Sequence, residues 1–309
     1  MYNEFTFWII FSIIAAVVIV IDLYLTEHRS GKLGLKRSII WSGVWIFTAL
    51  AFCTAIFLFL EKGHQRGIEF LTGYLIEYSL SVDNLFVFLM IFNVMGISQS
   101  NQPHILKWGI LSAIVFRIIF ILIGVGLINL FHFVIYIFGF ILLYGSYKMA
   151  FGKNEEINLE KHPVIKFIRK YFNILPNYEG KKFFIKQKGI IYATPIFLTL
   201  LLIESSDIIF AVDSIPAIIA ITRDTFVIIT SNIFAILGLR ALYFTLAGLV
   251  DLFVYLKYGV ALILFYVGIK MLLSNIFYIP TGISLAIIGS LLAGSIAFSV
   301  IKKKRNNQV

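Results

Sequence analysis

The sequence contains few of the residues that stabilise a disulfide-rich protein or bind soft metals. Its 309 residues include one cysteine, six prolines and only 16 acidic residues. A single cysteine, Cys53, excludes an intrachain disulfide and a thiolate cluster, and its apolar neighbours predict a buried thiol. The sequence also lacks a GxxxxGK[ST] loop and any large soluble segment, so it gives no sign of an ATPase.

Apolar residues dominate what is present. They make up 60% of the chain, charged residues make up 14%, and the mean hydropathy is +0.94. A soluble domain of this length cannot bury so much apolar surface, so much of it must face lipid. We therefore predict an all-α integral membrane protein with nine transmembrane helices, each of about 20 residues or more. The predicted spans are 5–25, 39–60, 70–96, 109–131, 133–151, 190–221, 226–249, 254–273 and 279–301.

The basic residues predict the orientation. The first span carries Glu4 and lacks a cleavage site, so it does not resemble a signal peptide. Alternate loops hold most of the Lys and Arg, with nine of them between Lys153 and Lys188. By the positive-inside rule, the N-terminus is outside and the C-terminus is cytoplasmic. The net charge of +10 therefore reports topology and contact with the lipid bilayer, and we expect no nucleic-acid partner.

The longest segment between spans is a predicted cytoplasmic loop, 152–189. Within it, apolar residues at Ile165, Ile168 and Phe172 alternate with basic ones over 163–175. That spacing is typical of a short helix lying on an anionic membrane surface.

An internal repeat relates two parts of the chain, which otherwise form a single transmembrane domain over 1–309. Glu77 through Asp83-Asn84 resembles Asp207 through Asp213-Ser214, Arg117 matches Arg240, and Tyr144 through Lys148 matches Tyr266 through Lys270. These landmarks recur in the same order across three spans each. We therefore predict repeat A over about 67–151 and repeat B over about 190–273. Three spans are an odd number, so the copies have inverted topology, which in transporters places the substrate site at their interface.

Acidic residues inside the spans are the candidate functional groups. An ionised group at the bilayer centre costs at least ~2.5–3.5 kcal/mol, so unpaired carboxylates there need a partner. Two intramembrane arginines can neutralise two acids, and protons, metal cations or water must neutralise the others. The acids are Asp22, Glu77, Asp83, Glu204, Asp207 and Asp213.

These side chains predict a cation site built from oxygen ligands. Pro216 follows Asp213 by three residues and predicts a helix break that would let the acids converge; a simple packing kink is the alternative. The predicted metal ligands are Glu77, Asp83, Asn84, Glu204, Asp207, Asp213 and Ser214. The predicted supporting or proton-relay residues are Asp22, Arg117, Asn232 and Arg240. Because no histidine lies in the acidic spans and no sulfur ligand lies near the motifs, Mg²⁺, Ca²⁺ and Mn²⁺ suit the site better than Zn²⁺ or Cu⁺.

At these motifs the chain resembles the TerC family of integral membrane proteins, most closely its Alx-type bacterial members. The likeness rests on 70–87, on Glu204 through Ala217, on Ser231 through Phe244 and on the Tyr192-Ala-Thr-Pro195 stretch. It implies a manganese exporter of the bacterial inner membrane, within the LysE-like transporter group. It maps the membrane acids of the family onto the six acids named above.

The leading hypothesis is a secondary transporter that exports Mn²⁺ in exchange for protons. A Ca²⁺/H⁺ exchanger is an alternative of the same class, and a membrane scaffold that delivers metal to partner proteins is an alternative of another class. We expect no enzyme, because no nucleophile constellation is present. We expect no tightly bound cofactor, with Mn²⁺ or Ca²⁺ as the transported ion. A homo-oligomer and membrane partner proteins stay open.

Overall fold

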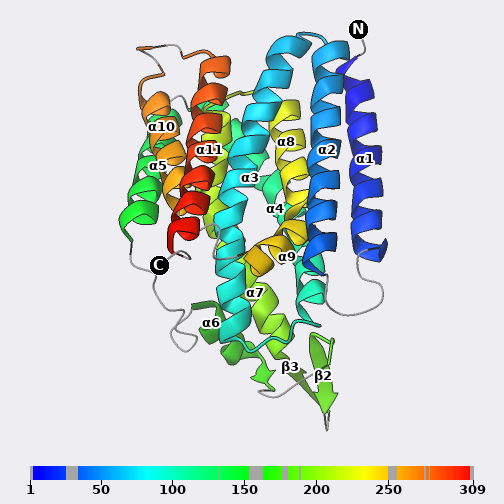
Figure 1. The fold of residues 1–309 in the computed structure, drawn as a ribbon. Helices are drawn as coiled ribbons and strands as arrows, with labels where there is room; N and C mark the ends of the chain where they lie inside the picture. Colours follow the sequence, from blue (N-terminus) through cyan, green and yellow to red (C-terminus); the bar gives the residue numbers. More distant parts are fainter. Residues whose placement is uncertain are drawn as a thin grey trace.

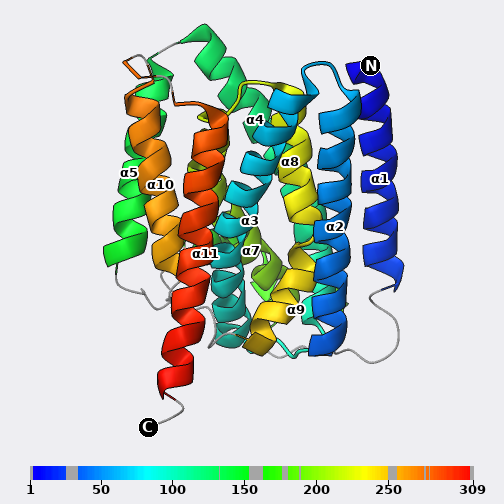
Figure 2. The same ribbon diagram turned by 45° about the horizontal axis from the view of Figure 1, so that its top comes forward.

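The protein forms a bundle of long, roughly antiparallel helices (Figure 1). This computed structural model describes residues 3–25, 34–131, 133–152, 163–175, 180–187, 189–249, 256–274, 276–277 and 279–306. The helices are α1 (Glu4–Leu25), α2 (Leu35–Phe59), α3 (Gly63–Val94), α4 (Gln102–Leu130), α5 (Val134–Phe151), α6 (Pro163–Tyr171), α7 (Pro195–Ile219), α8 (Thr225–Leu237), α9 (Leu239–Leu249), α10 (Leu256–Leu272) and α11 (Thr281–Asn306). Helix α1 begins at what we call the upper end, and α11 ends at the lower end (Figure 2).

The helices support the prediction of an integral membrane protein. Among the described residues, seven helices are long and apolar enough to cross a membrane: α1, α2, α3, α4, α5, α7 and α11. Helices α8 and α9 meet at an angle of 47° and would make an eighth span together. Helix α10 has 17 residues. The all-helical membrane fold therefore agrees with the sequence, while the count of nine spans and the orientation stay predictions.

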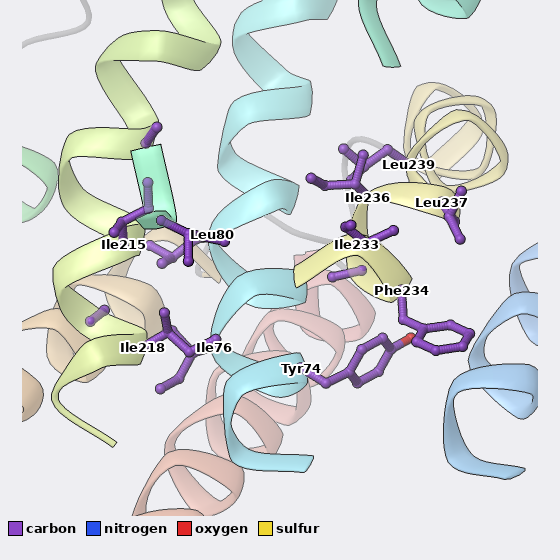
Figure 3. Packing of buried hydrophobic residues seen from close by; sticks show 14 of the residues in the cluster. Tyr74, Ile76, Leu80, Ile215, Ile218, Ile233, Phe234, Ile236, Leu237 and Leu239 are labelled. Carbon is purple, nitrogen blue, oxygen red and sulfur yellow. The ribbon is translucent and has the colours of Figure 1, made fainter. Parts of the chain in front are cut away.

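Helix α3 lies at the centre of the bundle. It packs against α2, α7, α8, α9 and α11, and α5 packs against α10. Apolar side chains fill the contact between α3 and α7, where Ile76 faces Ile218 and Leu80 faces Ile215 (Figure 3). All four are at most 5% exposed. This packing is tight enough to seal the space between the two helices.

The predicted break at Pro216 is not present. Helix α7 continues through Pro216 and ends at Ile219, and the predicted third span is also one continuous helix, α3. Because Pro216 lies in the last turn, its missing N–H leaves only the carbonyl of Val212 without its helical donor. The bend lies instead at Gly238, between α8 and α9.

The predicted surface helix of 163–175 is shorter than expected. Helix α6 ends at Tyr171, and a small sheet follows, with strands β1 (Asn173–Ile174), β2 (Phe184–Gln187) and β3 (Ile190–Ala193) in the order β1-β3-β2. Strand β3 pairs parallel to β1 and antiparallel to β2. The predicted span starting at 190 therefore starts at Pro195, after β3. Ile168 packs with Ala193 and Leu198, so the apolar side of α6 is covered partly by protein.

Candidate functional site

Arg117 on α4 joins two acids that come from different helices. Its Nη1 lies 2.9 Å from Oε2 of Glu77 on α3, and its Nη2 lies 3.8 Å from Oδ1 of Asp207 on α7. The side chains of Arg117 and Glu77 are 1% exposed. One guanidinium therefore faces two carboxylates away from water, and the central cluster carries a net negative charge when both are ionised.

Two serines complete this central cluster. Arg117 Nη1 also donates to Oγ of Ser214, about two turns beyond Asp207 on α7. Ser81 Oγ donates to Glu77 Oε1 over 3.4 Å. Both serines are buried. The oxygens of Glu77, Asp207 and the two serines are hard ligands of the kind that divalent cations accept.

Glu204 lies one turn before Asp207 on α7 and forms a second part of the site. Ser112 on α4 donates to Glu204 Oε1, while Oε2 is buried without a hydrogen-bond partner. Beside it, Glu204 and Asp207 line a space of about 20 Å³ that is otherwise walled by apolar residues of α3, α4, α7 and α9. A space of ~10–15 Å³ or more can hold one water or one small ion. The two carboxylates therefore border a position of atomic size.

Asp213 lies away from Arg117 and faces α5. A Cβ added to Gly145 would lie 3.2 Å from the carboxyl carbon of Asp213, so this glycine lets the acid approach the α5 backbone closely. The charge of Lys148, three residues further along α5, interacts with that of Asp213. Asp213 therefore belongs to the interface of α7 with α5.

Asp22 and Arg240 form a separate buried pair. Arg240 Nε lies 3.3 Å from Asp22 Oδ2, and its Nη2 donates to the Asp22 carbonyl at 2.5 Å. This contact ties α1 to α9. The two intramembrane arginines thus neutralise acids, as the sequence predicts, but only Arg117 does so between α3 and α7.

The remaining predicted residues lie on α3 and α8. Asn84 is buried on α3, and Asn232 on α8 donates to the Ile228 carbonyl at 2.8 Å while its Oδ1 is buried without a partner. The Asp83 side chain lies outside the described residues. The described part of the chain contains no group of three or more His, Cys, Asp or Glu side chains arranged to hold a metal ion. Among the predicted ligands, Glu77, Asp207 and Ser214 therefore lie around Arg117. Glu204 lies next to this group, and Asp213 lies apart from it.

Sequence reasoning missed Ser112 and Gly145. Ser112 precedes Arg117 by five residues in an apolar span, and a polar residue so placed is a signal that it contacts another polar group. Gly145 lies in the Tyr144 through Lys148 landmark of the predicted repeat, where a small residue inside an apolar span is a signal of close helix approach.

Comparison with known proteins shows which family the chain belongs to. The chain matches the description "Integral membrane protein TerC family" over residues 62–307. The chain belongs to the TerC family. The matched region contains every acid and arginine described above except Asp22.

Curated relatives of this TerC family member extend over nearly the whole chain. The "Putative membrane-bound redox modulator Alx" of Escherichia coli K12 is 42% identical over 292 residues, which cover 92% of this chain and 91% of that protein. Alx of Photorhabdus laumondii is 39% identical over 300 residues, with 95% and 94% covered. A membrane protein of Myxococcus xanthus, STKORF319, is 41% identical over 297 residues, with 96% and 92% covered. No solved structure matches the chain.

Proposed function

We propose that this TerC family protein is a secondary transporter of the bacterial inner membrane that exports divalent cations, chiefly Mn²⁺, in exchange for protons. The observation that carries the proposal is the excess of buried carboxylates over cations at the centre of the bundle. Glu77 and Asp207 share the single guanidinium of Arg117, and Glu204 lies beside Asp207 without a basic ion-pair partner among the described residues. A proton or a metal ion must neutralise the remaining charge, because an unpaired carboxylate is costly inside a membrane.

Glu204 and Asp207 are the groups best suited to bind the ion. They line the same small space, and Glu204 Oε2 has no hydrogen-bond partner. The space is about the size of one ion, so the cation would exchange part of its water shell for carboxylate oxygens. Arg117 would orient Glu77, while Ser214 and Ser81 would supply neutral oxygens.

Proton exchange supplies the energy that export requires. Moving a positive charge out of a cell against an inside-negative potential costs ~2.3 kcal/mol per charge per 100 mV. A carboxylate must lose its proton to bind a metal, so one group can carry either species but not both. Proton entry would therefore displace the metal ion and drive the cycle.

Contacts between α5 and α10 support an inverted repeat that alternates access. Gly139 on α5 meets the backbone carbonyl of Gly268 on α10, and Ser146 Oγ donates to the Ala261 carbonyl at 2.8 Å. If the two predicted repeats are aligned by matching Lys148 with Lys270, Gly139 matches Ala261 and Ser146 matches Gly268. Each contact is therefore the counterpart of the other about a two-fold axis, as an inverted repeat requires.

The test is ⁵⁴Mn²⁺ flux into and out of proteoliposomes that carry a pH gradient. We expect wild-type flux to depend on the gradient and to fall at least tenfold in Glu204→Gln and in Asp207→Asn, since each change removes a charged ligand in a site of low dielectric constant. Asp83→Asn and Asp213→Asn test whether these repeat-related acids also take part. Glu61→Gln, an exposed carboxylate in the α2–α3 turn, is the matched control and should retain full flux.

Other outcomes favour other functions. Flux of ⁴⁵Ca²⁺ that exceeds that of Mn²⁺ in competition would indicate a Ca²⁺/H⁺ exchanger. Absence of flux under every gradient, with metal or protein binding intact, would overturn the transporter and favour a scaffold that delivers metal. The redox role in the names of the Alx relatives would need an electron carrier other than a dithiol, because this chain has one cysteine.

A further inference from the structure

A second polar site lies at the upper end of the bundle, outside the central cluster. A cavity of about 470 Å³ is bordered there by the start of α3, the α7–α8 connection, the end of α10 and the start of α11. We call it the upper cavity. Its charged lining residues are Lys62, Arg66, Glu69, Arg223, Asp224 and Lys270.

Two of these charged residues form an ion pair, and one of them also caps the start of a helix. Arg66 Nε lies 2.7 Å from Asp224 Oδ2, and Asp224 Oδ1 accepts from the Phe226 and Val227 amides at the start of α8. Arg66 also contacts Glu4 on α1 at 2.8 Å. This pair therefore has a structural role that accounts for both of its members.

Glu69 is different because it is buried and faces the cavity. It is 6% exposed. Gln65 Nε2 donates to its Oε1 at 2.8 Å, and Thr222 Oγ1 donates to its Oε2 at 2.6 Å. Each carboxylate oxygen can accept a further contact, so Glu69 is an oriented anionic group with free lone pairs.

Lys270 supplies the only buried ammonium among the described residues that line this cavity. It is 9% exposed, and its Nζ donates to Ser284 Oγ at 2.9 Å; Tyr266 OH shares that hydroxyl at 3.0 Å. Its charge interacts with that of Glu69. Because Glu69 and Lys270 line the same cavity, a cation that binds Glu69 there would compete with the ammonium of Lys270.

An apolar layer separates the upper cavity from the central cluster. Glu69 and Glu77 lie eight residues apart on α3, about 12 Å along the helix. Between them, a Cβ added to Gly73 would lie 2.7 Å from Ile218 Cδ1 and 2.9 Å from Ser231 Oγ, so α3 meets α7 and α8 there without a gap. The contact of Ile76 with Ile218 belongs to the same layer (Figure 3).

We propose that the upper cavity is an exit site for the transported cation, in which Glu69 binds the divalent ion and Lys270 competes with it. This inference rests on the proposed function. After the apolar layer opens, the ion moves from the central carboxylates to Glu69. The ammonium of Lys270 then replaces it, which weakens binding and releases the ion on the side away from the cytoplasm.

The test measures Mn²⁺ binding to the purified full-length protein, using the electron paramagnetic resonance signal of free Mn²⁺. Removal of the competing ammonium in Lys270→Met should tighten one Mn²⁺ site at least tenfold, because repulsion of a divalent ion by a neighbouring unit charge at an effective dielectric constant near 20 exceeds the free energy of a tenfold change. The double variant Glu69→Gln/Lys270→Met should lose that tight site. It removes both buried charges that line the cavity together, so neither is left without the other, and it is the safer variant for folding.

Matched variants make the result specific. Lys62→Met removes one positive charge from the rim of the same cavity and should leave the affinity unchanged, and Lys270→Arg should behave as the wild type. The exit site is overturned if Lys270→Met changes no affinity, or if the gain survives in the double variant. If either of these outcomes is found while the wild type still transports Mn²⁺, the proposed export stays intact and only the exit site is overturned. The expected binding pattern without any wild-type flux would overturn export and leave Glu69 as a cation site.

Discussion

At the scale of single residues, Arg117 contacts acids on two helices that the sequence repeat relates to each other. Glu77 belongs to the predicted repeat A, and Asp207 occupies the matching position of the predicted repeat B, while both contact Arg117. Replacing one member of a buried ion pair leaves the other charge uncompensated, at a cost of about 3–5 kcal/mol. We therefore expect Arg117→Met to lower the free energy of unfolding in detergent by about 3 kcal/mol or more.

The double variant Arg117→Met/Glu77→Gln provides the comparison. It removes one of the stranded carboxylates, so it should recover part of the lost stability. Equal stability of wild type and Arg117→Met, followed by tryptophan fluorescence during denaturation, would mean that the guanidinium does not stabilise the acids.

Asp213 gives a second prediction at this scale, through Gly145. A methyl group on Gly145 would lie 3.2 Å from the carboxyl group of Asp213 and must displace it by a few tenths of an ångström. Because catalysis and transport depend on the placement of charged groups, we expect Gly145→Ala to lower Mn²⁺ flux several-fold. Gly126→Ala on α4 is the control, since nothing lies within 4 Å of its added Cβ. Equal flux in the two variants would separate Asp213 from the transport path.

At the scale of secondary-structure elements, the crossing of α5 and α10 depends on two glycines. A Cβ on Gly139 would lie 2.8 Å from Leu272 Cδ2 and 3.3 Å from the Gly268 carbonyl. Larger side chains would separate the helices, and overpacking of a core costs about 1–3 kcal/mol. We expect Gly139→Val to lower the melting temperature in detergent, while Gly126→Val changes it much less. A melting temperature lowered equally by both variants would attribute the loss to helix propensity alone.

The elements also show where prediction from the sequence succeeds and where it stops. Long apolar runs predict the helices well, because hydropathy is a local property. The bend at Gly238 was not predicted, since glycine inside an apolar run is a weaker signal than Pro216, whose ring is accommodated in the last turn of α7. The strands of β1 to β3 are at most four residues long, too short for a periodic pattern.

Some features of the candidate site could also be predicted from the sequence, and others could not. The sequence indicates which acids and arginines lie inside the apolar spans, because a charge in an apolar span is conspicuous. It does not indicate which acid pairs with which arginine. Arg117 lies 40 residues from Glu77, and Arg240 lies 218 residues from Asp22, so only the packed bundle brings these partners together.

At the scale of the whole molecule, the single cysteine allows a direct test of orientation. In a Cys53→Ser background, Glu61→Cys and Ser100→Cys each place one thiol in an exposed turn, at the upper and lower ends of α3 respectively. The predicted orientation puts residue 61 outside and residue 100 in the cytoplasm. In intact cells, a membrane-impermeant maleimide should therefore label Glu61→Cys and not Ser100→Cys. The reverse pattern would invert the topology and with it the direction assigned to transport.

The upper cavity has a consequence for chemical intervention. Its volume of about 470 Å³ lies within the range of ~300–1,000 Å³ that is typical of pockets for small molecules. With the predicted orientation, it opens away from the cytoplasm, so a compound that binds there need not cross the lipid bilayer. A zwitterion with an ammonium group for Glu69 and an anionic group for Lys270 would match both buried charges and act as an inhibitor applied from outside the cell.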